Sequence, residues 1–107
     1  MAGGFGDMQK MMKQLQKMQA DMAKMQEELS QRTVEATSGG GVVRVVANGQ
    51  HEVKEIKIDV TVIDPNEPEL LEDLVLAAVN EALRKAQDMV SAEMGKLTGG
   101  MKLPGVF

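Results

Sequence analysis

The sequence contains few side chains that could do covalent or metal chemistry, and its single histidine is the first to consider. His51 has no cysteine near it, because the chain contains none, and no acidic cluster stands beside it at ligand spacing. Zinc and other transition metals are held by several such ligands together. We therefore interpret His51 as a solvated residue beside a turn, and we predict no metal site and no cofactor.

A run of three glycines, Gly39–Gly41, is the second feature to weigh, because glycine-rich loops can hold phosphates. Phosphate-binding loops continue into a Lys-Ser/Thr pair and a helix, whereas this run leads into the β-rich residues 42–47. We interpret it as a connection between two strands. The sequence also shows no Ser-His-Asp set and no carboxylate pair at an interpretable spacing, so it does not predict an enzyme.

Lysines on one face of a predicted helix offer a different chemistry, the binding of phosphate groups. They are Lys10, Lys13, Lys17 and Lys24. With Met8 at heptad position a, these lysines fall at positions c and f, away from the apolar positions a and d. Most of them lie in the N-terminal half, where the helix dipole disfavours cations, and Lys13 has no opposite charge at helical spacing. We hypothesise that this face binds nucleic-acid phosphates.

The alternative interpretation of these lysines is an ordinary solvated helix face. Lys17 and Lys24 are each followed four residues later by an acid, Asp21 and Glu28, and such pairs are common on exposed helices. The spacing alone leaves both interpretations open.

Three bases on a second predicted helix are further candidates for DNA binding: Arg84, Lys85 and Lys96. The spacing gives Arg84 a partner in Asp88 and Lys85 a partner in Glu81, so we rank these two below the lysines of the first helix.

The net charge of −4 argues against a generic nucleic-acid binder, but the acids are concentrated in one stretch. Residues 64–81 contain no base and hold Asp64, Glu67, Glu69, Glu72, Asp73 and Glu81. Most of these acids fall in the opening turns of the second predicted helix, where the dipole favours carboxylates.

The residue types restrict the kind of nucleic acid that could be bound. Lysine suits phosphate oxygens, whereas base recognition favours bidentate Arg, Asn or Gln, so we predict low sequence specificity. The chain has no Trp and no Tyr on which unpaired bases could stack. Double-stranded DNA is therefore the predicted target.

Seven apolar residues recur at alternating spacings of three and four in the first predicted helix. They are Met8, Met11, Leu15, Met18, Met22, Met25 and Leu29. This heptad seam predicts a long helix that needs a partner helix. Since a chain of 107 residues buries only a modest fraction of its surface alone, we predict a homodimer with the seam at its interface. The many methionines leave one alternative function, a Met-rich adaptor or chaperone-like module that binds protein helices.

The remaining elements follow from alternation and turn signals. Residues 33–38 and 42–47 are predicted strands, and Asn48-Gly49 is a two-residue hairpin signal before a third strand that begins at about Glu52. In the third strand, Ile56, Ile58, Val60 and Val62 share an apolar face, so one covering layer is expected. Residues 60–63 either extend this strand or connect it to the second helix.

Two long helices flank these strands in the prediction. Asp7 is the expected N-cap of the first helix, which runs to about Gln31. Asn66 is the expected N-cap of the second helix, which has Pro68 in its first turn and runs to about Leu97. The fold class is α+β, an α-β-β-β-α subunit with a three-stranded antiparallel sheet. We predict one domain, 1–107, with flexible tails at 1–6 and 99–107. No apolar run reaches membrane length, so we expect a cytoplasmic protein.

Several stretches resemble the YbaB/EbfC family of bacterial nucleoid-associated proteins. They are Met8-Gln-Lys-Met-Met-Lys-Gln-Leu-Gln-Lys-Met-Gln19, Gly39–Gly41 before Val-Val-Arg-Val, residues 71–86 (Leu-Glu-Asp-Leu-Val-Leu-Ala-Ala-Val-Asn-Glu-Ala-Leu-Arg-Lys-Ala), and Met94-Gly-Lys-Leu-Thr-Gly-Gly100. The resemblance covers nearly the whole chain. It implies a tweezer-shaped homodimer that binds duplex DNA, alters its conformation, and contributes to nucleoid organisation and gene regulation. It carries over no DNA-contacting residue.

Overall fold

The computed structural model describes residues 3–97, and side chains within 6–96. The elements are α1 (Gly3–Gln31), β1 (Thr33–Ser38), β2 (Val43–Asn48), β3 (Val53–Ile58), a 3-10 turn η1 (Val60–Val62) and α2 (Pro68–Leu97). The predicted order of helix, three strands and helix is therefore confirmed. The tail predicted at 99–107 lies outside the described residues.

The strands form one antiparallel sheet in the order β1-β2-β3, so β2 is central. In the register, Ala36 pairs with Val45, and Val45 pairs with Ile56. Directly paired residues point to the same side of a sheet, so these residues mark one apolar face. The sequence predicted one apolar face for the sheet, because apolar and polar residues alternate along the strands.

The core lies between that face and α2. Val43, Val45 and Ala47 of β2 are fully buried against a stripe of alanines on α2, Ala78, Ala82 and Ala86, which also have no exposed surface. Alanines four residues apart lie on one face of a helix, and their small side chains let the helix approach the sheet closely. The single covering layer is thus α2, which packs on β1 and β2 and leaves β3 largely uncovered.

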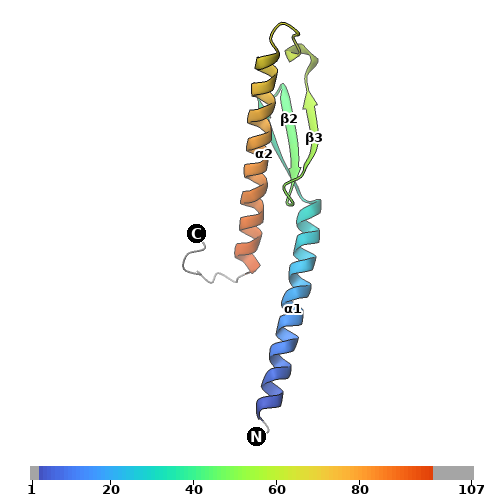
Figure 1. Ribbon diagram of the computed structural model, residues 1–107, viewed down its shortest axis with the longest axis vertical. Helices are drawn as coiled ribbons and strands as arrows, with labels where there is room; N and C mark the ends of the chain where they lie inside the picture. Colours follow the sequence, from blue (N-terminus) through green and yellow to red (C-terminus); the bar gives the residue numbers. More distant parts are fainter. Residues whose placement is uncertain (1–2, 98–107) are drawn as a thin grey trace.

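The first helix leaves this core. Figure 1 shows α2 running along the sheet, whereas α1 continues well beyond the C-terminal end of α2. The molecule is consequently long and narrow, 80 × 26 × 16 Å. We call α1 the arm, and the sheet together with α2 the body.

The first helix begins at Gly3, four residues before the predicted N-cap Asp7. Glycine weakens a helix by about 1 kcal/mol relative to alanine but does not stop it, so helical structure extends through Gly6. Asp7 therefore lies inside the helix, and the tail predicted over residues 1–6 is helical from Gly3.

The two-residue hairpin predicted at Asn48-Gly49 is wrong. Asn48 is the last residue of β2, and the connection to β3 runs from Gly49 to Glu52. It closes with hydrogen bonds from His51 N to Asn48 O (3.1 Å) and from Asn48 N to Glu52 O (3.0 Å). The positive φ of this turn falls on His51 (62°), since histidine tolerates the left-handed region better than most residues do.

The third strand ends at Ile58, which settles the alternative left open for residues 60–63. Val60–Val62 form the 3-10 turn, and Asp59 caps it by accepting a hydrogen bond from Thr61 N at 2.9 Å. Val60 and Val62 therefore leave the sheet instead of continuing its apolar face.

The second helix begins at Pro68, so the predicted N-cap Asn66 is wrong. Asn66 instead donates its backbone N–H to Asp64 Oδ1 at 2.9 Å, within a turn that precedes the helix. Proline suits the first helical position because its missing N–H would have no intrahelical partner there.

Candidate nucleic-acid interface

The arm presents its lysines to solvent without partners. Lys10, Lys13, Lys17 and Lys24 are all exposed. Among the described residues, none of the four makes an ion pair within 4.0 Å, so the pairs that the spacing allowed with Asp21 and Glu28 are not formed. Ammonium groups on an exposed helix without a carboxylate partner are available to an external anion.

The bases predicted on the second helix are engaged differently. Arg84 Nη1 pairs with Glu81 Oε2 at 2.7 Å, and Lys85 Nζ donates to the backbone oxygen of Glu35 at 3.0 Å. The partners expected from spacing, Asp88 for Arg84 and Glu81 for Lys85, are therefore wrong. Glu81 lies one turn before Arg84, and Lys85 reaches across to the neighbouring strand β1.

The remaining predicted base, Lys96, lies near the root of the arm, by which we mean residues 29–32, where the arm meets the body. Its Nζ pairs with Glu93 Oε1 at 3.3 Å. The same carboxylate oxygen accepts a hydrogen bond from Arg32 Nη1 at 2.7 Å. The bond from Arg32, and then that from Lys96, lowers the pKa of Glu93 from its ordinary value of 4.5. Glu93 therefore stays ionised and joins α2 to the residue that follows the arm.

The open face of the sheet carries charged residues that are not among the predicted DNA-binding residues. Arg44 Nη2 on β2 donates to Glu35 Oε2 on β1 at 2.8 Å, and this bond lowers the pKa of Glu35. Lys57 pairs with Glu55 at 3.4 Å along β3. Lys54 differs from these residues, because it is exposed and has no ion pair among the described residues. Most charges of this face are thus neutralised, Arg44 across two strands by Glu35 and Lys57 along its own strand by Glu55.

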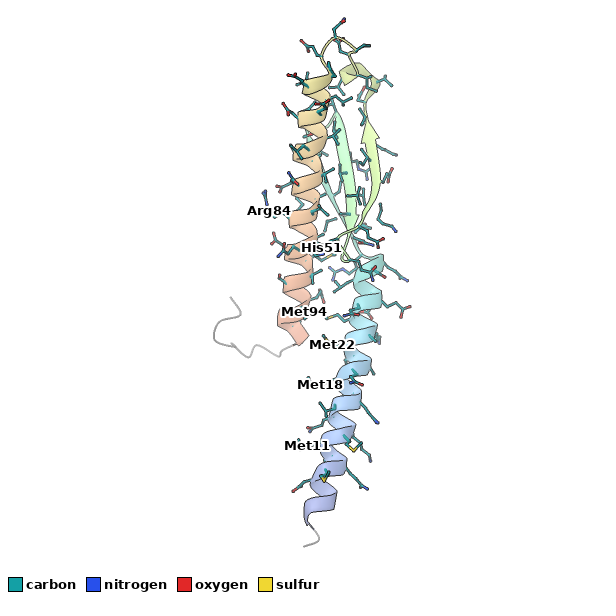
Figure 2. The ribbon with its side chains drawn as sticks, in the orientation of Figure 1. Met11, Met18, Met22, His51, Arg84 and Met94 are labelled. Atoms are coloured by element: carbon teal, nitrogen blue, oxygen red, sulfur yellow. The ribbon has the colours of Figure 1, made fainter. Side chains whose placement is uncertain are left out.

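The predicted seam divides into two parts. Met8, Met11, Leu15 and Met18 are 57–64% exposed, whereas Met22 and Met25 are half-buried. Leu29, at the end of the seam, is only 4% exposed and packs within its own chain. Figure 2 shows Met11 and Met18 on the part of the arm that lies beyond α2, and Met22 nearer to Met94.

A cleft of about 390 Å³ lies where the arm meets the body. It is lined by Met22, Met25, Gln26, Leu29, Gly49, Gln50, His51, Val90 and Met94. His51 is exposed there, as predicted for a solvated turn residue. Within the part of the chain that the structure describes, no group of three His, Cys, Asp or Glu residues could hold a metal ion.

A second apolar surface, not predicted from the sequence, runs between β3 and α2. A cleft of about 460 Å³ is lined by Ile58, Leu71, Glu72, Val75, Leu76 and Val79. Leu76 is 60% exposed, and Ile56 on the neighbouring strand is 45% exposed. We call this surface the β3–α2 groove. It exists because α2 covers β1 and β2 and leaves the apolar side of β3 open.

Residues 4–101 match the YbaB/EbfC DNA-binding family. A nucleoid-associated protein of Pelotomaculum thermopropionicum is 62% identical over 102 residues, which cover 95% of this chain and 97% of the relative. A nucleoid-associated protein of a Geobacillus species is 58% identical over 107 residues, which cover 100% of this chain and 99% of the relative.

Among solved structures, the crystal structure of an uncharacterized protein from Helicobacter pylori is similar in fold, with a TM-score of 0.65 and 20% identity. The match covers 78% of this chain and 96% of that one. At this identity the likeness concerns the fold, and it agrees with the predicted α+β class.

Proposed function

The chain belongs to the YbaB/EbfC DNA-binding family, and from that premise we propose that it binds double-stranded DNA as a homodimer with low sequence specificity. The family is a non-enzymatic group of DNA-binding proteins, so the prediction that the chain is not an enzyme is confirmed. Since the similar proteins of Pelotomaculum and Geobacillus are nucleoid-associated, we place this protein at the bacterial nucleoid, in the cytoplasm. There it alters DNA conformation and contributes to nucleoid organisation and gene regulation.

The observation that carries the proposal is the contrast between free and paired bases. The arm lysines are exposed and unpaired, so they can meet phosphates without first breaking an ion pair. Charges beyond about 8 Å are largely screened at physiological salt, so the acidic opening of α2 does not prevent this contact. In a dimer, two copies of Lys10, Lys13 and Lys17 neutralise at most about six phosphates.

Low specificity is supported by the state of the arginines. The chain has three, and each is paired with a carboxylate: Arg32 with Glu93, Arg44 with Glu35 and Arg84 with Glu81. Bidentate arginine is the side chain that most often reads guanine in the major groove. With the arginines engaged and lysines free, binding is expected to depend on phosphates and therefore little on sequence.

The homodimer is supported by two exposed apolar surfaces. We assign the larger share of the interface to the β3–α2 groove, because it is a concave surface on the rigid body and continuous with the core. The exposed half of the seam, from Met8 to Met18, supplies a second surface on the arm. Apolar areas of this kind on a soluble chain mark interaction sites.

The experiment that tests the proposal is a gel-shift titration of the full chain with random duplex DNA over a range of salt concentrations, with single-stranded DNA and RNA for comparison. Binding to every duplex should weaken steeply as salt rises, with a slope of log K against log salt no steeper than about −5 from these lysines. Binding that favours one duplex by several orders of magnitude would contradict low specificity.

The exposed methionines favour one other function, the Met-rich adaptor that holds protein helices. The same titration separates the two functions. Capture of an apolar helical peptide persists at high salt because the hydrophobic effect does not depend on charge, whereas phosphate contact is lost. A protein that binds amphipathic peptide but no duplex at low salt would support the adaptor instead.

A further inference from the structure

We propose that the β2–β3 turn and Glu93 fix the direction in which the arm leaves the body, and that Asn48, Gly49 and Glu93 are therefore positioning residues for DNA binding. This inference rests on the proposed function, because it assigns a use to the direction of the lysine-bearing arm.

The first step is that the arm is held only at its root. Its outer residues, from Met8 to Met18, are well exposed, and the first of its seam residues to be fully buried is Leu29, near its end. Of the strands and α2, the described contacts of the arm are chiefly with β2. Figure 1 shows that most of the arm lies beyond the end of α2. Its direction is therefore set near its C-terminal end, by the contacts around Leu29 and the half-buried Met22 and Met25.

The second step is that the turn caps the C-terminus of the arm. The last carbonyls of a helix have no intrahelical donor. Here the backbone N–H of Gly49 donates to Leu29 O at 2.9 Å, and Nδ2 of Asn48 donates to Ser30 O at 3.0 Å. Two donors from one turn of the body thus bind two successive carbonyls of the arm, which fixes the axis of the helix relative to the sheet.

Asn48 is itself fully committed to this arrangement. It is 1% exposed, and its Nδ2 also donates to Glu52 Oε1 at 3.2 Å. Its Oδ1 accepts from the backbone N–H of Gln50 at 2.9 Å and of Glu52 at 3.0 Å. Both donors and both acceptor positions of the amide are therefore used, so the side chain cannot rotate without leaving buried polar groups unpaired.

Glycine is required at position 49 because the arm approaches this residue closely, and not because of its φ angle. A Cβ at this position would lie 2.5 Å from Leu29 O and 2.7 Å from Leu29 Cβ. Both atoms belong to the arm root, so any side chain at position 49 must push the arm away from the turn.

The third step is a tie on the other side of the root. Arg32, directly after the arm, is bonded to Glu93 on α2 at 2.7 Å. A glutamate is ionised at neutral pH, and the bond from Arg32 lowers the pKa of Glu93 further. The β2–β3 turn joins the end of the arm to the sheet, and Glu93 joins it to α2. Contacts from two elements restrict both the tilt and the rotation of a helix whose outer part, from Met8 to Met18, is exposed.

A fixed direction matters because several lysines must reach phosphates together. If the arm is fixed before binding, DNA does not have to order it, and that ordering cost is absent from the affinity. If the root is loosened, affinity falls. The number of lysines that contact phosphates is unchanged, so the salt slope stays the same. Loss of affinity at constant slope is therefore the signature of a positioning residue.

The experiment measures the arm directly and then its effect on DNA. Because the chain has no cysteine, Gln14→Cys on the arm and Gln87→Cys on α2 take two spin labels cleanly, and both sites are exposed. Labelled chain is diluted in excess unlabelled chain of the same variant. Electron-spin distance measurements then compare the unsubstituted background with Gly49→Ala and Glu93→Gln.

Glu81→Gln is the matched control, because it also frees an arginine and adds the same charge but touches no residue of the arm. We expect one narrow distance distribution in the unsubstituted background and in the control, and a broadened or shifted one in the two root variants. Duplex affinity should fall about threefold in Glu93→Gln and about tenfold in Gly49→Ala, at unchanged salt slope.

Unchanged distances in both root variants would overturn the proposal. It would also be overturned if Glu93→Gln and Glu81→Gln increased the affinity for DNA by the same factor, because the added charge alone would then explain the result. If Gly49→Ala fails to fold, Glu93→Gln alone decides the outcome. Absence of DNA binding by the unsubstituted protein would refute the proposed function instead, and the distance measurement would still show whether these residues fix the arm.

Discussion

The arm and the body both carry basic and apolar side chains, but many of these are paired or buried on the body and exposed on the arm. On the body, Arg44 and Arg84 are paired with carboxylates, and Val43 and Val45 have no exposed surface. On the arm, the lysines have no ion pair with any residue that the structure describes, and Met18 is 64% exposed. The paired arginines and buried valines of the body are thus satisfied within the chain, and the β3–α2 groove is the exception, whereas the lysines and outer methionines of the arm are left for molecules outside the chain.

The difference shows how an acidic protein can bind an acidic polymer. The charge that decides contact with DNA is the local charge of the exposed arm, not the net −4 of the chain. The acids that outnumber the bases lie mainly around the start of α2, and Figure 1 shows that this end of the molecule is opposite to the N-terminal end of the arm.

The strongest test of the comparison removes the charge of the arm. Replacing Lys10, Lys13 and Lys17 by Gln should weaken duplex binding about a hundredfold or more at physiological salt and flatten the salt slope, for every duplex alike. Unfolding free energy should barely change, because these exposed lysines hold no ion pair. Gel shifts and urea titrations measure the two quantities.

The control for that triple variant makes the same charge change on the body. Lys54, Lys57 and Lys85 are replaced by Gln together, and their loss should alter affinity by less than about threefold. If the body triple weakens binding as much as the arm triple, the DNA surface is not confined to the arm, and the comparison between arm and body fails.

The next test concerns the apolar groups of the body. Leu76→Lys places a charge in the β3–α2 groove and should dissociate the homodimer, since an unpaired charge buried at an interface costs several kcal/mol. Light scattering should then show a folded monomer. Leu70→Lys, at an exposed leucine outside that groove, is the control and should leave the mass unchanged. A dimer of normal mass in Leu76→Lys would move the interface elsewhere.

A smaller effect is expected from the apolar groups of the arm. Met18→Lys places a charge in the exposed part of the seam and should lower the thermal stability of the dimer by a few degrees, or weaken its association. Scanning calorimetry together with light scattering measures both effects. Unchanged stability and mass would mean that Met18 does not meet a second copy, which would favour the adaptor function for the methionine face.

The parts of the fold that could be predicted are those whose signals are local. The alternation in Thr33–Ser38 and the long apolar face of α2 contain their own periodicity, so strand, helix and covered face followed from the sequence. The lysine face followed from the heptad register for the same reason. Such patterns need only neighbours within a few positions along the chain.

The arm root could not be predicted because its contacts join distant residues. Asn48-Gly49 matches the sequence motif of a two-residue hairpin. Its glycine is needed instead because Leu29 of the arm approaches it closely, and the motif does not indicate that contact. Arg32 finds its partner 61 residues away in Glu93, and Lys85 finds a backbone oxygen 50 residues away in Glu35. Nothing in the spacing of either base indicates these partners.

The smallest expected effect is a pH dependence at the arm root. The pKa of Glu93 is lowered by its bond to Arg32 and then by Lys96, so between its folded pKa and 4.5 the unfolded chain binds more protons than the folded one. The contribution of Glu93 to stability is therefore present above pH 4.5 and is lost as the pH falls through the folded value. The other charged groups that line a cleft together with Glu93 and Lys96 are Asp21, Lys24 and Glu28 of the arm.

Glu35 and Asp59 also have lowered pKa values and change stability in the same direction, so the wild type alone cannot isolate Glu93. The difference in unfolding free energy between the wild type and Glu93→Gln cancels their effect. Urea titrations between pH 7 and pH 3 should show this difference shrinking below pH 4.5, and the arm distances of the wild type should broaden over the same range. A difference that stays constant with pH would mean that the charge of Glu93 does not hold the arm root.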